Sequence, residues 1–148
     1  MKKNSTKKLY TVLGIILFIS TVNALHATCQ GIGGLISPES FGIEWLEMDK
    51  WMQITVLVGR MVGGLVFSAL LYAFTINTIK GYKAGVLFPR KNFGILIACS
   101  VALFVYMFCY DNMALVGIAN DAVRQIVLDL NTVVCSMTFV VFALMYKI

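Results

Sequence analysis

The sequence predicts an all-α integral membrane protein, built from a signal peptide, two to three transmembrane helices and an amphipathic outer helix. First, 59% of the 148 residues are hydrophobic and only 13% are charged, whereas soluble domains carry about 25% charged residues. The mean hydropathy is accordingly high, at +0.86. Second, two apolar segments are long enough to cross a bilayer as helices. Third, acidic and basic residues separate to opposite sides of these segments. No internal repeat or linker divides the chain, so one membrane domain, residues 28–148, is expected after the signal peptide.

The N-terminal segment, residues 1–27, has the pattern of a signal peptide. Its first ten residues, MKKNSTKKLY, are basic, and TVLGIILFISTV then forms an apolar run of about a dozen residues, as signal peptides do. Ala24 and Ala27 each supply a small residue before a cleavage position, and cleavage after Ala27 is preferred. The alternative is an uncleaved signal anchor, which would add one helix without changing the topology that follows.

An outer segment, residues 28–52, is predicted between the signal peptide and the first span. It starts with GIGGLISPES, a glycine-rich stretch expected to form a loop, and continues with ESFGIEWLEMDKWM. Trp45 and Trp51 lie in this second part, and tryptophans beside a span usually sit among the lipid headgroups. We therefore expect an interfacial helix that anchors the first span.

The distribution of basic residues sets the orientation of the spans, residues 53–79 and 93–110. The loop between them, residues 80–92, carries Lys80, Lys83, Arg90 and Lys91 and no acid, so the positive-inside rule predicts that it is cytoplasmic. All seven acidic residues then fall on the outer side. The protein is thus expected in the bacterial inner membrane, with the N-terminus of the mature chain in the periplasm.

The C-terminal third contains two further elements. Residues 112–130 have apolar residues at three- and four-residue steps, which predicts an amphipathic helix that lies on the membrane or docks against a partner. Residues 132–147 form a third apolar segment. Because it is short, it is either a marginal span or a re-entrant helix.

Small residues repeat at four-residue steps within both spans. The first span contains Gly59, Gly63, Gly64 and Ser68, and the second contains Gly94, Ala98 and Ala102. Such small-xxx-small patterns allow transmembrane helices to approach closely. Two of them on adjacent spans favour a tight hairpin or a homo-oligomer.

Arg60 is the single charge predicted inside a span, where a charge at mid-helix costs about 2.5–3.5 kcal/mol on insertion scales. It is expected to pair between helices or subunits or to line a pore, or else to extend toward the outer headgroups. Cys109 and Cys135 both lie near the outer boundary, so they either form a disulfide or remain two ordinary cysteines of apolar segments.

Composition argues against several other classes of function. His26, the only histidine, lies in the predicted signal peptide, and neither a nucleophile motif nor a paired acidic site is present. We therefore expect no enzyme, cofactor or metal site. Removal of Lys2, Lys3, Lys7 and Lys8 leaves eight basic against seven acidic residues, and so direct nucleic-acid binding is not expected.

The layout resembles small membrane components of bacterial type IV secretion and conjugation systems. The resemblance is carried by residues 58–105, especially GRMVGGLVFSALLYAFTINTIKGYKAG and NFGILIACSVAL. These are similar to VirB/TraA-type pilins, in which two spans flank a short basic loop, and to the IcmC/IcmD (DotE/DotP) group of the Dot/Icm branch. The resemblance covers about a third of the chain. The chain departs from the pilins in its longer loop and in the elements after the second span.

The resemblance implies a structural membrane subunit of a type IV secretion or conjugative transfer apparatus, which acts by oligomerisation and partner docking. Its partners would be membrane lipid, other copies of itself and other membrane subunits of such a complex. Two alternatives remain: a pilin-like filament subunit, and a small channel or holin-like pore with Arg60 and the small residues in its wall.

Overall fold

The computed structural model describes residues 2–45, 50–86, 89–116 and 126–147. Within these ranges the protein is all-α, as the sequence predicts. The four α-helices are α1 (Lys2–Ile36), α2 (Lys50–Lys83), α3 (Lys91–Asp111) and α4 (Leu130–Met145). Two short 3-10 helices, Pro38–Phe41 and Met113–Leu115, follow α1 and α3. Among the described residues, α1, α2 and α3 are long and apolar enough to cross a membrane, and α4 is shorter.

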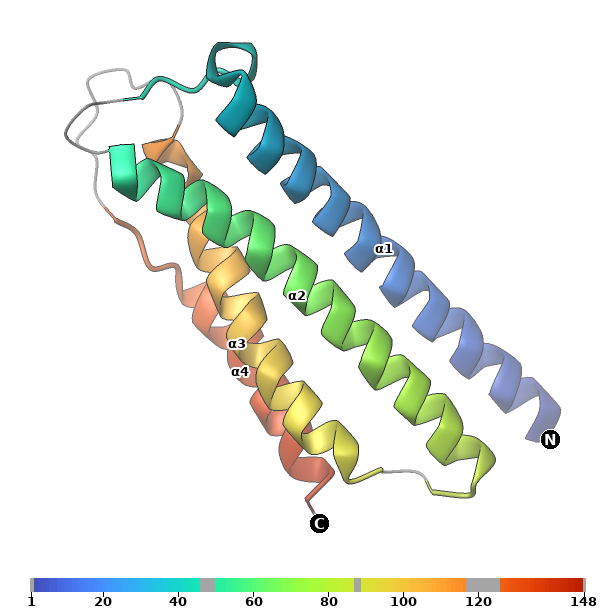
Figure 1. Ribbon diagram of the computed structural model, residues 1–148. Helices are drawn as coiled ribbons and strands as arrows, with labels where there is room; N and C mark the ends of the chain where they lie inside the picture. The colour runs from blue at the N-terminus through green and yellow to red at the C-terminus, as the bar shows by residue number, and fades with distance from the viewer. Residues whose placement is uncertain (1, 46–49, 87–88, 117–125, 148) are drawn as a thin grey trace.

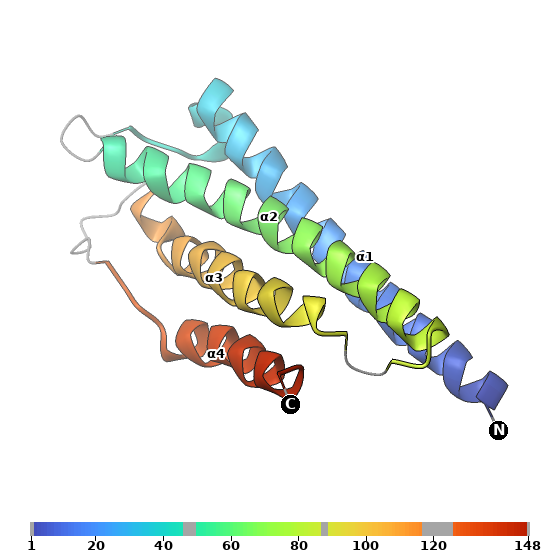
Figure 2. The ribbon, with the colours of Figure 1, turned by 60° about the horizontal axis from the view of Figure 1, so that its bottom comes forward.

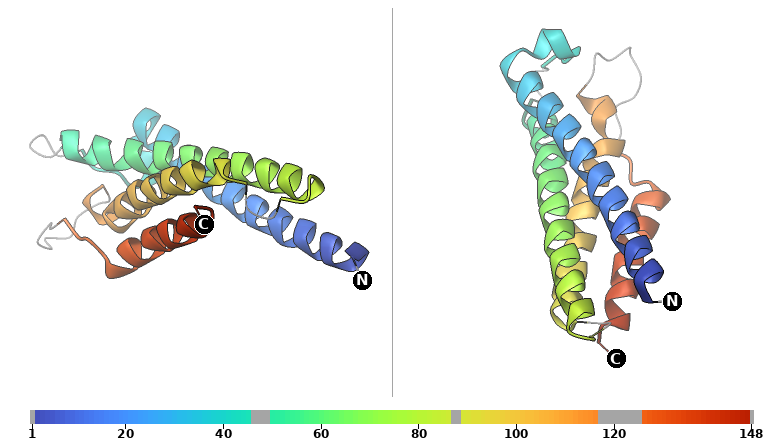
Figure 3. Two further views of the ribbon diagram at one scale, coloured as in Figure 1. Left: turned by 90° about the horizontal axis from the view of Figure 1, so that it is seen from below. Right: turned by 90° about the vertical axis from the view of Figure 1, so that its right-hand side faces the viewer.

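The helices pack in chain order, each against the next (Figure 1). Views from two directions place α1 beside α2 and α4 beside α3 (Figures 1 and 2), and no Cα atoms of α1 and α4 lie within 8 Å of each other in the described ranges. Both chain termini lie at the end of the bundle where α2 connects to α3 (Figure 3). We call this the basic end. Its described charged residues are all cationic: Lys7, Lys8, Lys80, Lys83, Arg90, Lys91 and Lys147.

The first helix extends well beyond the predicted apolar core of the signal peptide. It runs without interruption through Ala24 and Ala27 to Ile36, so the loop predicted for GIGGLISPES is wrong over its first six residues. Gly31 and Gly34 are buried helical positions instead, since their missing side chains admit Met61 and Leu57 of α2. The interfacial helix expected over 39–52 is wrong over its first part, because Pro38–Phe41 is a 3-10 helix and residues 42–45 are not helical. Residues 46–49 lie outside the described residues, and the last part of the expected helix is the first turn of α2.

The connection between α2 and α3 is shorter than the predicted loop, residues 80–92. Lys80 and Lys83 belong to the last turn of α2, where cations favour the helix dipole, and Lys91 begins α3. Gly85 ends α2 with a φ of 77°. The Val86 N–H donates to the Gly81 carbonyl and the Gly85 N–H to that of Tyr82, which is the Schellman arrangement of a glycine-terminated helix.

The amphipathic helix predicted over residues 112–130 is wrong at both of its described ends. The chain forms one 3-10 turn at Met113–Leu115 and is non-helical over residues 126–129; residues 117–125 lie outside the described part. The Asn112 side chain takes the place of helical hydrogen bonds at Val127, because it donates to the Val127 carbonyl and accepts from the Val127 N–H. Asp129 then caps α4 by accepting a hydrogen bond from the Asn131 N–H at 3.0 Å.

Candidate functional site

The candidate site is the set of helix interfaces, since these contain most of the residues that the sequence singles out. The predicted small residues of α2 are all used within the chain. A Cβ atom on Gly63 would lie 2.9 Å from the Tyr106 backbone nitrogen of α3, and one on Gly59 would lie 2.6 Å from the Cys109 Sγ. The small residues of α2 thus pack within a tight α2–α3 hairpin, which is one of the two expected arrangements.

Gly64 and Ser68 extend the same ridge toward α1. A Cβ on Gly64 would stand 3.7 Å from the Ala27 Cβ and 3.2 Å from the Tyr106 ring. The three helices α1, α2 and α3 therefore meet at this glycine. Ser68 lies one turn further along α2 and is buried against Ser20 of α1. One row of small residues therefore serves two interfaces.

The predicted ridge on α3 is only partly used. Ala102 is buried and Ala98 is half-buried, but Gly94 is exposed, and nothing lies within 4 Å of the position that its Cβ would occupy. Leu96 and Cys99 are buried instead, because the buried face of α3 is rotated away from Gly94.

The face of α1 toward α2 is a continuous seam that the sequence interpretation missed. Its members are buried or half-buried residues spaced alternately by four and three: Leu13, Leu17, Ser20, Ala24, Ala27, Gly31 and Gly34. This 3.5-residue period keeps one stripe of a helix against its neighbour over many turns, and the five outermost members are small. The seam crosses both predicted cleavage positions without a break in the helix.

Buried polar side chains fasten each pair of neighbouring helices. Between α1 and α2, the Ser68 hydroxyl donates to the Ser20 carbonyl at 2.9 Å, so the Ser20 hydroxyl is the donor in the 2.6 Å contact between the two Oγ atoms. In the same way, Thr21 donates to its own helix and accepts from the Tyr72 hydroxyl at 2.9 Å. Each such bond is worth about 0.6–2 kcal/mol in a membrane.

Similar bonds join the other two helix pairs. The Asn92 amide of α3 donates to Thr78 of α2 at 3.0 Å, close to the basic end. The Ser100 hydroxyl of α3 donates to the Ser136 carbonyl of α4 at 2.7 Å, and Thr132 of α4 donates to the carboxylate of Asp111. The three interfaces of the bundle are therefore specified by polar pairing as well as by close packing.

Arg60 lies inside the bundle. Its side chain is only 4% exposed, and the guanidinium carbon stands 5.0 Å from the centre of the Tyr110 ring. This is cation–π geometry, which is stronger where water is excluded. Its Nε has no hydrogen-bond partner among the described residues. Arg60 thus links α2 to the last turn of α3, as the inter-helix expectation proposed.

The predicted Cys109–Cys135 disulfide does not form in this structure, in which all four cysteines are free. Cys109 is buried against Gly59 of α2, whereas Cys135 on α4 is exposed. Cys109 fills the space that the glycine leaves, and α3 meets α4 through Ser100 and Ser136 instead.

The end of the bundle opposite the basic end carries two amide side chains that the sequence interpretation did not identify. Gln53 is fully buried, and its Nε2 donates to the carbonyls of Glu44 and Leu115 at 2.9 and 3.0 Å. Asn112, 2% exposed, holds Val127 as described above. Because both amides bind backbone groups of distant segments, only the three-dimensional structure reveals them.

The topology-determining residues Lys80, Lys83, Arg90 and Lys91 gather at one end of the bundle, as predicted, together with both chain termini. No group of three or more potential metal ligands occurs among the described residues. Comparison of the chain with protein-family models, with curated proteins and with solved structures gives no match.

Proposed function

We propose that this protein is a structural membrane subunit of a bacterial type IV secretion or conjugative transfer apparatus, located in the inner membrane with its basic end in the cytoplasm. In this role it acts as a fixed helical scaffold that docks against other membrane subunits. The basic connection between α2 and α3 supports the orientation, because cytoplasmic segments beside spans are enriched in lysine and arginine.

The observation that carries the proposal is an apolar surface at the outer end of the bundle. Trp51 at the start of α2 is 81% exposed and Leu130 at the start of α4 is 74% exposed. Ile126 and Leu128, in the segment before α4, are also exposed. A groove of about 300 Å³ runs between the start of α2 and the end of α3; its lining includes Met52, Val56, Phe108 and Ile126. We call this region the outer groove. Concentrated apolar surface of this kind marks a contact with protein or membrane.

Photo-crosslinking in cells that express the full chain natively tests this docking role. With a photoreactive amino acid at Trp51 or Leu128, we expect crosslinks to other membrane proteins of a secretion or conjugation complex. The control positions are Ile19 and Val101, which are also exposed apolar residues and lie within α1 and α3; there we expect crosslinks to lipid. Equal protein crosslinking at all four positions would contradict a specific outer groove.

Gentle detergent extraction of the tagged chain separates this proposal from the alternatives. A large assembly that contains other secretion components is expected. A single-component oligomer that depolarises cells on overexpression would favour the pore, whereas recovery of the chain in sheared extracellular material would favour the pilin.

The proposal includes α1 as a permanent helix of the bundle. Its seam of small residues and its bonds to Ser68 and Tyr72 support the uncleaved signal anchor rather than a discarded signal peptide, because a segment destined for removal needs no such fit to α2. We expect mass spectrometry of the protein purified from membranes to recover residues that precede Ala24. A chain that begins after Ala24 or Ala27 would refute the retention of α1.

A further inference from the structure

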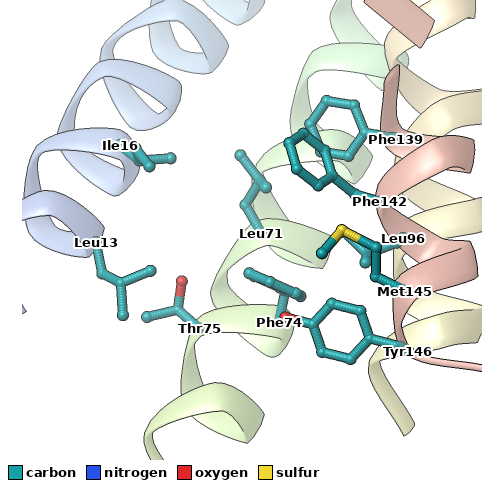
Figure 4. A pocket seen from close by; sticks show the side chains of 10 residues that line it. All are labelled: Leu13, Ile16, Leu71, Phe74, Thr75, Leu96, Phe139, Phe142, Met145 and Tyr146. Atoms are coloured by element: carbon teal, nitrogen blue, oxygen red, sulfur yellow. The ribbon is translucent and has the colours of Figure 1, made fainter. Parts of the chain in front are cut away.

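A cavity of about 420 Å³ separates α1 from α4 near the basic end of the bundle. Figure 4 shows Leu13 and Ile16 of α1 on one side, Phe139 and Phe142 of α4 on the other, and Leu71 of α2 between them. Thr75 and Tyr146 are the polar members of the lining; all the other lining side chains are apolar. Since no Cα atoms of α1 and α4 lie within 8 Å of each other in the described ranges, the cavity is a wedge between these two helices.

The wedge is held open by the packing of its walls. The Ser20–Ser68 and Thr21–Tyr72 bonds attach α1 to α2, while the Ser100–Ser136 bond attaches α4 to α3. On the α4 side, Phe139 packs edge-on against Phe67 of α2, with ring centres 5.5 Å apart. The gap therefore cannot close simply by moving α4 toward α1, because each wall is fastened elsewhere.

The charges around the wedge indicate what fills it. Lys8 and Lys147 stand at the ends of the two walls and do not line the cavity itself. Lys8 lies about 8 Å along α1 from Leu13 and about 140° around the helix from it, and Lys147 directly follows Tyr146. All described charged residues at this end are cationic, and the described acids Glu39, Glu44, Asp111 and Asp129 lie at the opposite end. An apolar wedge below a cationic rim matches a phospholipid with an anionic headgroup, and basic pockets between transmembrane helices bind such lipids.

The size of the cavity favours an acyl chain over a protein helix. A helix about 10 Å across fills about 400 Å³ for each turn, so the cavity has room for about one turn. A flexible acyl chain needs no such cylinder. We therefore propose that the wedge between α1 and α4 binds one acyl chain of an anionic phospholipid of the cytoplasmic leaflet, with its phosphate held by Lys8 and Lys147. This site requires the retention of α1 proposed above.

Native mass spectrometry of the purified full chain with added phosphatidylglycerol or phosphatidylethanolamine tests the site. We expect preferential retention of phosphatidylglycerol. Ile16→Trp should displace it by filling the wedge, whereas Ile15→Trp should not, since Ile15 is also exposed but does not line the cavity. Ile16 is 44% exposed and Ile15 is 54% exposed, so we expect both variants to fold.

The headgroup contact is tested by a second matched pair of variants. Lys8→Gln with Lys147→Gln should weaken retention of phosphatidylglycerol by about five-fold for each charge removed. Lys80→Gln with Lys83→Gln removes the same charge from the same end, but from the last turn of α2 and not from the ends of the α1 and α4 walls, and should have little effect.

Three outcomes would overturn the inference. Equal loss of phosphatidylglycerol in both pairs of lysine variants would show only a general attraction of anionic lipid to the basic end. Equal retention of phosphatidylglycerol in Ile16→Trp and Ile15→Trp would show that the lipid binds elsewhere. A bound polypeptide lost only in Ile16→Trp would show that a partner helix occupies the wedge. The same spectra give the mass of the chain, so a failure caused by removal of α1 is distinguished from a full-length chain that does not bind lipid.

Discussion

Gly63→Leu should separate α2 from α3 and give the largest loss of stability of any single change at the helix interfaces. Even the first carbon of the new side chain would lie 2.9 Å from the Tyr106 nitrogen and 3.1 Å from its Cα. These are backbone atoms, so no side-chain rotation relieves the contact. We expect a loss of about 3 kcal/mol, the upper range for overpacked interiors, and a lower thermal midpoint in mild detergent.

Reactivity of Cys109 provides a local measurement of the same change. Its thiol is buried against Gly59 and should become reactive to maleimide when α2 and α3 separate. The measurement uses a Cys29→Ser, Cys135→Ser background, since both of those cysteines are exposed. Gly94→Leu is the control, because nothing lies near that position. If Gly63→Leu left the thermal midpoint and Cys109 labelling unchanged, close α2–α3 packing would be refuted.

Asn112→Ala should release the segment that leads into α4. The Asn112 Oδ1 accepts from the Val127 N–H at 2.8 Å, while its Nδ2 donates to the Val127 and Phe108 carbonyls at 2.7 Å each. Removal of the amide leaves the two Val127 groups without these partners. Each unsatisfied buried group costs about 1–3 kcal/mol; because Val127 is half exposed, we expect about 2 kcal/mol in total. Hydrogen exchange at the Val127 amide should become fast.

Two further variants define the role of Asn112. Asn112→Asp keeps the acceptor for the Val127 N–H but loses the donors, so it should retain part of the protection against exchange. Asn131→Ala should change stability by less than about 0.5 kcal/mol, since the Asn131 side chain is exposed and bonds only to Asp129. Unchanged exchange at Val127 in Asn112→Ala would show that other contacts hold this segment.

Hydropathy predicts the helices α2 and α3 closely because a bilayer dictates both the length and the composition of a span. Small residues at Gly59 and Gly63 likewise predict close packing, but not which neighbour they meet. The α2–α3 hairpin uses them, while Gly94, equally prominent in the sequence, faces outward. The pattern specifies which surface can pack, and the rotation of the helix decides whether it does.

The extent of α1 was misjudged because glycine has two opposite uses. Gly31 and Gly34 were interpreted as loop residues, on the basis of their low helix propensity in water. In a bundle their missing side chains permit contact with Met61 and Leu57, and packing outweighs propensity. The alternating spacing of four and three from Ser20 to Gly34 was visible in the sequence and would have indicated a packed helix. Asn112 offered no such signal, because its partner lies fifteen residues away in an irregular segment.

The unequal lengths of the helices have a consequence for the surrounding bilayer. The 16 residues of α4 span about 24 Å, less than the 30 Å thickness of a typical hydrocarbon core, whereas the 34 residues of α2 span about 51 Å. Hydrophobic mismatch of this kind is relieved by tilting the long helix and thinning the lipid beside the short one. We therefore expect the bilayer around this protein to be thinner along α4 than along α2.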